Sequence, residues 1–399
     1  MPFNVITGDM GSGKSLCIKL LYFFEEIFVS SILLSPRFSK EFFEDGNFFE
    51  QLSENFKKIF YLNGNKWHGL KITYSFQANG SNFTISLNWD DTKNELLWEC
   101  DYLKKNMGKW SGYFNFPDTP DMSMEVTKRI HREITHDFLD KLPISTFFVP
   151  ASRAALSVVG SNTPFKDHFL NEFARSKDFL LSRFDTNLNG KLADILKVKS
   201  VQKNPNDVGD VCLEHKDGRV VPSLFSSSGQ QELVYLLLLM EKMPEIKFIY
   251  GRMLSVFIEE PSAHLFPKEQ KELIENIVAL FRREKKIETR FFITTHSPYV
   301  LNVINNMLKK SSIRKKHPEK AEEIDKKIDF PHLCVEEVSA IFINEYGKTV
   351  DMFNPDNEEK VDNDDKDIIL ADRIQAISKL INDDIQELFD LEEELNGNS

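Results

Sequence analysis

Eight consecutive residues near the start of the chain have the types and the spacing of a phosphate-binding loop. Residues 8–15, GDMGSGKS, fit the pattern GxxxxGK[ST] between an apolar run over 3–7, typical of a buried strand, and a helical pattern over 15–28. Glycines let backbone N–H groups turn toward phosphate oxygens, the lysine adds a positive charge, and the serine hydroxyl is a ligand for Mg²⁺. We therefore expect a nucleoside triphosphate and Mg²⁺ to bind through Gly8, Gly11, Ser12, Gly13, Lys14 and Ser15.

Polar side chains follow two further apolar runs that are typical of buried strands. Glu259 and Glu260 follow the run over 254–258, and His296 follows the run over 290–294. Two carboxylates at such a strand end could bind Mg²⁺ and polarise an attacking water, and the histidine could donate to a γ-phosphate. Taken alone, most acidic pairs of this kind are solvated, and a single strand-end histidine is more often a structural residue.

A loop of small residues leads directly into the most apolar helix that the sequence predicts. Residues 226–229 are Ser-Ser-Ser-Gly, and the helical pattern runs over 230–243. Backbone N–H groups and the positive end of a helix make such a loop a second anion site. Taken alone, a serine-rich loop here is more often a helix cap.

The order of these four elements along the chain resembles that of ABC-type ATPases. Residues 258–267, IEEPSAHLFP, and 293–299, ITTHSPY, are similar to the branch that contains the OLD (overcoming lysogenization defect) ATPases and their relatives in prokaryotic anti-phage systems. The RecF/SMC-like ATPases are close to this branch. The similarity in spacing extends over most of residues 1–310, and it implies an ATPase that binds ATP and Mg²⁺.

The resemblance also implies a role for each group. Glu259 would bind Mg²⁺, Glu260 would be the general base, and His296 would be the switch histidine, while His264 would lie in the D-loop. The signature loop, which contacts the γ-phosphate of ATP held by a partner subunit, would comprise Ser227, Ser228, Gly229 and Gln230.

Some positions of the family pattern are matched less closely. Residues 147–153 are similar to a strand-to-loop element of this branch, which makes Arg153 a further candidate site residue. Gln77 is a candidate for the Q-loop glutamine only by elimination. Glu259 stands where ABC-type ATPases more generally have aspartate. The strands and the adenine-stacking aromatic residue that usually precede the phosphate loop have no counterpart, so base recognition is not assigned.

Composition restricts the class of protein. The 399 residues are 41% hydrophobic and 28% charged, which excludes a collagen, a disulfide scaffold and wholesale disorder. The four cysteines form no CxxC pair, and the longest apolar run, over 233–240, is too short for a bilayer, so we expect a cytoplasmic protein without membrane contact. The net charge of −12 resides in the tail, where residues 351–399 hold about 16 acidic and about four basic residues.

Alternation of strand and helix patterns in the second half predicts an α/β fold. We expect an ABC-ATPase-like P-loop core with a mixed β-sheet flanked by helices, an antiparallel β subregion and a helical insertion. Residues 71–76 and 83–87 alternate as in an antiparallel hairpin, whereas the polar stretch over 187–210 predicts an irregular insertion and the basic stretch over 309–327 predicts a solvated surface. Most of the 34 phenylalanines are interpreted as core residues.

Four regions follow from this pattern. Residues 1–150 would form an N-terminal ATPase lobe, 151–225 the helical and irregular insertion, and 226–310 a C-terminal ATPase lobe. Residues 311–399 would form a basic linker, a hairpin and an acidic C-terminal helix, which either docks a partner or is simply solvated. The acids at 362–367 lack flanking buried strands, so we interpret them as a linker and not as the metal site of a TOPRIM nuclease.

Three functions remain open at this point. The first is an ABC-type ATPase with composite ATP sites in a head-to-tail homodimer or higher oligomer, serving as the sensor or regulatory subunit of a bacterial anti-phage system. It would act with a separate effector protein such as a nuclease or toxin. The second is a RecF/SMC-like ATPase that binds DNA in repair or maintenance. The third is a scaffold that binds ATP with negligible hydrolysis.

Overall fold

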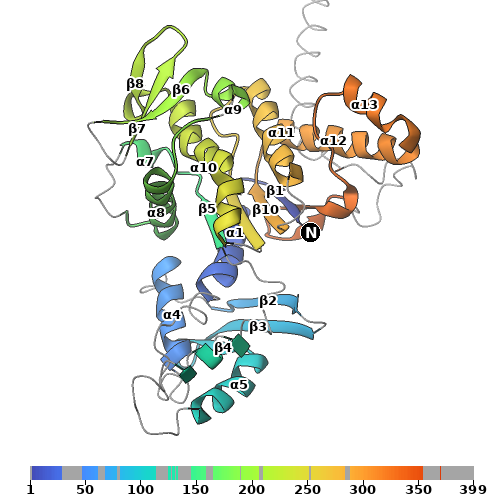
Figure 1. Cartoon of the computed structure of the whole chain (residues 1–399). Helices are drawn as coiled ribbons and strands as arrows, with labels where there is room; N and C mark the ends of the chain where they lie inside the picture. The colour runs from blue at the N-terminus through green and yellow to red at the C-terminus, as the bar shows by residue number, and fades with distance from the viewer. Residues whose placement is uncertain are drawn as a thin grey trace, which may run out of the picture. The chain divides into compact units, whose positions relative to one another are not determined.

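The chain divides into two compact units, one formed by residues 1–18 with 147–399 and the other by residues 19–146 (Figure 1). The computed structural model describes residues 2–28, 47–61, 68–78, 81–113, 125–126, 128–130, 132–133, 145–158, 165–188, 190–205, 210–250, 253–283, 288–353 and 369. Apart from residue 369, the predicted C-terminal helix lies outside these residues.

A six-stranded sheet forms the centre of the first unit. Its three inner pairings from β11 to β9 are parallel, and β12 is antiparallel to β11, so the sheet is mixed. In order across the sheet, the strands are β12 (Thr349–Asp351), β11 (Val338–Ile343), β1 (Phe3–Gly8), β10 (Glu288–Thr294), β9 (Met253–Glu259) and β5 (Ser145–Val149). The predicted α/β class with a mixed sheet is confirmed.

The inner strands are apolar along most of their length because helices cover the sheet. Phe3, Val5, Phe257, Phe291 and Ile293 are fully buried, as expected for parallel strands with both faces covered. Figure 1 shows two of the covering helices, α10 and α11, in front of the sheet. The longer helices of this unit are α8 (His168–Arg183), α10 (Ser228–Tyr250), α11 (Pro267–Arg283) and α12 (Pro298–Lys316), and the α1 helix (Lys14–Tyr22) begins in it.

Helix α10 is buried on every side over most of its length. The apolar run over 233–240 is at most 3% exposed at each residue. A helix that is apolar all round belongs in a protein core, which matches the run that the sequence places there. Its N-terminus, by contrast, carries the exposed serine loop.

An antiparallel sheet lies partly in a segment for which the sequence predicted irregular structure. Residues 187–210, predicted to be irregular, contain the α9 helix (Gly190–Ile195) and the β6 strand (Val198–Lys203). Strand β6 pairs with β7 (Val211–His215), which pairs with β8 (Val220–Pro222). The sequence of β6 does not show the alternation of apolar and polar residues that is typical of a strand, because its buried side chains are only Val198 and Val201 among exposed lysines. A shift of register after Val198 also interrupts the two-residue period.

The basic stretch over 309–327 is more ordered than predicted. Helix α12 continues to Lys316, and the α13 helix (Ala321–Lys327) follows. Lys310 is only 5% exposed, and its ammonium donates to the carbonyls of Ile328 and Phe330 at 2.8 and 2.6 Å. The prediction of a fully solvated stretch is therefore wrong at Lys310, whose buried charge is satisfied by backbone acceptors. Short helices η2 (Ser223–Phe225), η3 (Pro318–Lys320), η4 (Val335–Glu337) and α7 (Ala155–Val158) complete the unit.

The second unit packs aromatic side chains against an antiparallel sheet. The hairpin predicted over 71–87 is confirmed as β2 (Lys71–Ala78) and β3 (Ser81–Asp90), and β4 (Glu95–Glu99) adds a third strand that the sequence reading missed. Phe23, Phe56 and Trp98 form a buried cluster, with ring centroids 5.2 Å apart for the phenylalanine pair. The interpretation of phenylalanines as core holds in this cluster. Helices in the described part of this unit include η1 (Phe23–Phe28, a π-helix), α4 (Asn47–Ile59) and α5 (Asp101–Gly112).

None of the helices in the described part of the chain combines the length and the apolar character that crossing a membrane requires.

Candidate nucleotide site

Three of the predicted motifs meet at one edge of the central sheet. Ile6 of β1 is level with Thr294 of β10, and Thr294 is level with Glu259 of β9. Neighbouring strands lie about 4.8 Å apart, so β1 and β9 are separated by about 10 Å. The loops that follow these strands therefore leave the sheet together at its carboxyl edge, where α/β sheets bind ligands.

The phosphate loop has the backbone that an anion requires. Gly11 and Gly13 have φ angles of +75° and +99°, which residues with a side chain rarely adopt. No heavy atom lies within 4 Å of where a Cβ would stand on either glycine, so the concave side of the loop is open. The Ser12 hydroxyl is buried without a hydrogen-bond partner among the described residues. The loop thus fits a phosphate group.

Lys14 lies over this loop. Its ammonium donates to the carbonyl oxygens of Gly8 and Asp9 at 2.8 and 2.7 Å. Both acceptors are neutral, and a phosphate oxygen is a stronger acceptor for the same charge. The lysine is therefore placed where a bound triphosphate would compete for it.

Glu260 and His296 contact each other directly. Nδ1 of His296 lies 2.8 Å from Oε2 of Glu260, and the backbone N–H of His296 donates to the same oxygen at 3.3 Å. The Glu260 side chain is only 17% exposed, whereas that of His296 is 73% exposed. A largely buried carboxylate beside an accessible imidazole can orient a water and a phosphate oxygen at one place.

Glu260 reaches this position through a strained backbone. Its φ angle is +45°, which is unusual for a residue with a side chain. Its N–H donates to the Thr294 carbonyl at 3.0 Å, which ties the end of β9 to the end of β10. The neighbouring Glu259 is 3% exposed, and its Oε2 accepts a bond from the Ala151 N–H at 3.1 Å.

The donor set at this edge fits Mg²⁺. The Ser15 hydroxyl, in the first turn of α1, and the Glu259 carboxylate, at the end of β9, are hard oxygen ligands. Mg²⁺ is usually held by one or two such groups together with substrate phosphates. The described residues contain no cluster of three or more histidine, cysteine or acidic side chains that would hold a metal by itself. Such a site would therefore take Mg²⁺ together with a nucleotide.

The serine loop is exposed at the start of α10. Ser227 and Ser228 are exposed, while a Cβ on Gly229 would stand 3.3 Å from the His264 carbonyl, so the glycine lets the helix pack closely on the loop after Glu260. The side chain of Gln230 is used within the chain, since Nε2 donates to the Leu196 carbonyl at 2.8 Å and Oε1 accepts from the Ser227 N–H at 3.2 Å. The Ser227 hydroxyl also donates to Oε1 of Gln230 at 3.2 Å, so an external anion would compete with Gln230 for the donors of Ser227, whereas Ser228 is exposed beside them.

The remaining candidates lie in different settings. His264 is exposed, with a φ angle of +59°, in the loop that packs on Gly229. Gln77 belongs to the second unit, on β2 opposite Asn82, and its assignment to the Q-loop stays a prediction. The acids at 362–367 lie outside the described residues.

Arg153 is the candidate whose surroundings differ most from an exposed site residue. It is 1% exposed, and its guanidinium bonds to backbone carbonyls and to Glu232 of α10. Burial lowers the pKa of Arg153, and the carboxylates of Glu232, Glu259 and Glu260 act in the opposite direction. Burial also raises the pKa of Glu232, against the effect of Arg153 and His264. Glu232 was missed by the sequence reading, although a lone acid entering an apolar helix could have signalled a buried partner.

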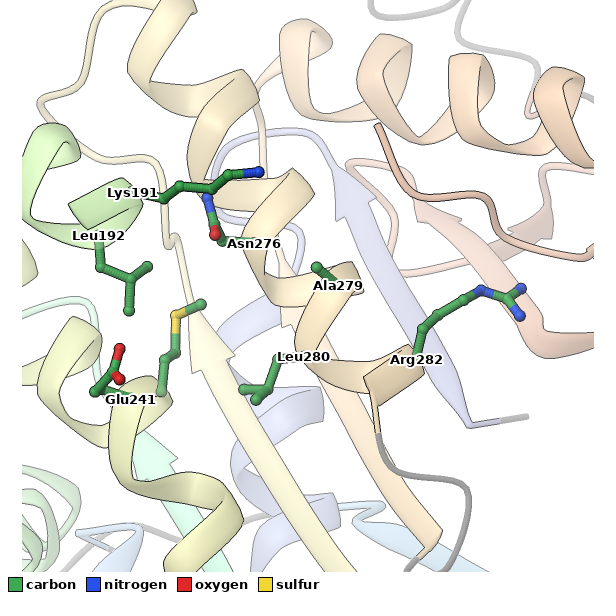
Figure 2. Close-up of a pocket in the computed structure, with 8 residues that line it drawn as sticks. Lys191, Leu192, Glu241, Asn276, Ala279, Leu280 and Arg282 are labelled. Carbon is green, nitrogen blue, oxygen red and sulfur yellow. The ribbon is translucent and has the colours of Figure 1, made fainter. Parts of the chain in front are cut away.

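A separate cavity of about 610 Å³ lies among α9, α10 and α11 (Figure 2). Lys191, Asn276 and Arg282 are among its lining residues, and none of the predicted site residues is among those described there. Arg282 donates to the His332 carbonyl and pairs with Glu337. The cavity is therefore distinct from the nucleotide site.

A family model matches part of the chain. The model of the family described as "AAA ATPase domain" matches residues 118–301, a range that contains the serine loop, Glu259, Glu260 and His296. None of the curated proteins compared with the chain matches it.

Two solved structures are among those similar to the chain. The SMC head domain from Thermotoga maritima is 12% identical, with a TM-score of 0.32 and coverage of 89% of this chain and 90% of that chain. The SmcHead bound to the C-winged helix domain of ScpA is 14% identical, with a TM-score of 0.37 and coverage of 76% and 84%.

Proposed function

We propose that this protein is an ATP hydrolase that acts as a head-to-tail homodimer. The observation that carries the proposal is the contact of Glu260 with His296, 2.8 Å long, at the sheet edge where the phosphate loop also ends. The match of residues 118–301 to an AAA ATPase domain supports the same class of activity. Each ATP would lie between the phosphate loop of one chain and the serine loop of the other.

Within one chain, the residues have complementary tasks. Backbone N–H groups of the phosphate loop and the Lys14 ammonium bind the β- and γ-phosphates, and Ser15 with Glu259 would hold Mg²⁺, which supplies charge neutralisation at the phosphates. Glu260 accepts a hydrogen bond from the attacking water and orients it in line with the bond to the leaving group. His296, beside Glu260, contacts the γ-phosphate through its accessible ring.

The exposed serine loop is the reason for proposing a dimer. Ser227 and Ser228 are exposed at the start of the 23-residue α10 helix, and a phosphate there would compete with Oε1 of Gln230 for the donors of Ser227. Such a helix end attracts a phosphate. A second copy of the chain would supply that phosphate as the ATP bound to its own phosphate loop, so closure of the dimer would depend on the nucleotide.

The sharpest test of the activity is Glu260→Gln, which removes the base and keeps the shape of the side chain. We expect ATP turnover to fall by about 10²–10⁴-fold while ATP binding and the ATP-dependent dimer persist. Turnover is measured by phosphate release in Mg²⁺, and dimers by light scattering with and without ATP. Equal turnover in the variant would remove Glu260 from the mechanism, and no turnover in the wild type would leave only an ATP-binding scaffold.

We also propose a biological role, as the regulatory ATPase subunit of a bacterial anti-phage system with a separate effector. The similarity of residues 258–267 and 293–299 to the OLD-like branch motivates this role. Native purification before and after phage challenge should recover a nuclease or toxin with the ATPase. Recovery of duplex DNA, with an affinity that falls steeply with salt and requires ATP, would instead favour the DNA-binding class.

A further inference from the structure

The guanidinium of Arg153 joins three parts of the first unit. Nε donates to the Glu232 carbonyl at 2.9 Å and lies 3.1 Å from the Glu232 carboxylate. Nη1 donates to the carbonyls of Pro150 and Glu259 at 3.1 and 2.9 Å. Nη2 donates to the carbonyls of Glu260 and Pro261 at 3.0 and 3.4 Å. At 1% exposure, with these six acceptor atoms around it, the group has no free face for a phosphate.

These contacts hold the strained residue of the site. The Glu260 carbonyl accepts from Arg153, and the Glu260 N–H donates to the Thr294 carbonyl. Both peptide groups around the φ angle of +45° are therefore fixed by distant parts of the chain. A left-handed conformation of this kind persists only where the surroundings enforce it. The direction of the Glu260 side chain toward His296 depends on that enforcement.

The same guanidinium is bonded to the helix that carries the serine loop. Glu232 lies in the second turn of α10, whose first residue is Ser228, and Glu232 is 5% exposed. Helices move as stiff bodies, so a displacement at Ser227 and Ser228 also displaces Glu232. Both charges of this pair are buried, and either charge left alone would be costly, so the pair resists separation.

We propose that Arg153 is a positioning residue that transmits the state of the serine loop to Glu260, and so couples the two ATP sites of a dimer. This inference rests on the proposed function. In a head-to-tail dimer, the serine loop of one chain contacts the ATP of its partner, whereas Glu260 of that chain acts on its own ATP. The path from the serine loop through Glu232 and Arg153 to Glu260 therefore leads from one site to the other.

The test uses Glu232→Gln in the full-length protein. This variant removes the carboxylate that faces Arg153 and keeps the Glu232 carbonyl that also accepts from it. The ATP dependence of turnover gives both kcat and a Hill coefficient, whose upper limit is the number of coupled sites. We expect a wild-type coefficient clearly above 1, and a variant coefficient near 1 with kcat lowered about tenfold and ATP affinity changed less than about twofold.

Asp185→Asn is the matched control, because it removes another ion pair of α10. Lys242 of that helix lies 2.7 Å from Asp185, and the pair makes no contact with Arg153. We expect its kcat and Hill coefficient to equal those of the wild type. Arg153→Lys keeps the positive charge but loses the planar guanidinium and its several N–H donors, and we expect this variant to behave like Glu232→Gln. If Arg153→Lys fails to fold, the Hill coefficient and kcat of Glu232→Gln alone test the coupling.

The outcomes separate this inference from the function on which it rests. A wild type without turnover overturns the proposed function and the coupling with it. A wild type that hydrolyses ATP with a Hill coefficient of 1, or a Glu232→Gln protein that keeps the wild-type coefficient, overturns the coupling alone. An equal loss in Asp185→Asn would also overturn it, because the effect would then come from a general loosening of α10.

Discussion

Gly8 and Gly11 belong to the same phosphate loop but are glycines for different reasons. Both have positive φ angles, +149° and +75°. A Cβ on Gly8 would stand 2.0 Å from the Ile343 carbonyl oxygen of β11, whereas a Cβ on Gly11 would meet nothing within 4 Å. The first glycine is required by packing against another strand, and the second only by its backbone conformation and by the room a phosphate needs.

Substitution by alanine separates the two reasons. We expect Gly8→Ala to destabilise the first unit by more than about 2 kcal/mol, because backbone must move to admit the methyl group, and Gly11→Ala by about 1 kcal/mol. Differential scanning calorimetry without nucleotide measures the difference as the melting temperature of each variant. Equal melting temperatures would show that the close approach of Gly8 to Ile343 does not affect the stability of the first unit.

At the scale of elements, the segment after α13 connects two helices. Arg282 at the end of α11 donates to the His332 carbonyl, and the Leu333 N–H donates to the Met307 carbonyl of α12 at 3.3 Å. Burial lowers the pKa of His332 to about 4, and the nearby Arg282 and Arg314 act in the same direction. The imidazole is therefore neutral in the folded protein at a pH where a free histidine is charged.

This segment predicts a dependence of stability on acid. In the unfolded chain His332 has its ordinary pKa of 6.5, so between pH 6.5 and about 4 the unfolded chain takes up a proton that the folded chain does not. Stability should fall as the pH is lowered through this window, and level off below it. We expect His332→Gln to lose less melting temperature than the wild type between about pH 7.5 and about pH 5.

The control for this prediction is His317→Gln, which replaces an exposed histidine at the end of α12 in the same way. Carboxylates contribute to acid sensitivity in all three proteins alike, so the comparison isolates the histidine. The same loss of melting temperature in His332→Gln as in the wild type would contradict the prediction.

At the scale of the whole molecule, the proposed composite sites would make two inactive chains complementary. Lys14→Ala should abolish ATP binding at the phosphate loop of its own chain, and Ser227→Arg should block the serine loop that the partner's ATP needs. In a mixture, a dimer with one chain of each kind contains one intact site and one doubly altered site. With random pairing, half of the dimers are mixed and each has one intact site, so turnover should return to at most about one quarter of the wild-type value, and to less if the two sites are coupled.

Each variant assayed alone is the baseline for this mixing experiment. A mixture no more active than either variant, although mixed dimers are present by mass, would mean that each site lies within one chain. Mixing Lys14→Ala with Glu260→Gln is the negative control, since both residues are proposed to serve the ATP of their own chain. No mixed dimer of that pair contains an intact site.

Local sequence patterns predict many of the secondary-structure elements of this protein. The phosphate loop, the apolar strands β1, β9 and β10, the β2–β3 hairpin and the apolar α10 helix could all be predicted from sequence. Their periods, glycines and turn residues act over a few positions, and each such element is set by neighbours in the chain. The β6 strand was not predicted, because its lysines obscure two buried valines in the sequence pattern.

Only the tertiary structure decided how distant residues meet. Position 8 must be glycine because the backbone of Ile343 lies close to it. Glu260 contacts His296 because β9 pairs with β10. Arg153 is buried by α10 and by the end of β9. Strand order and register, which no local period encodes, set these meetings. The sequence alone therefore determined which side chains could do chemistry, and sheet pairing determined which of them act together.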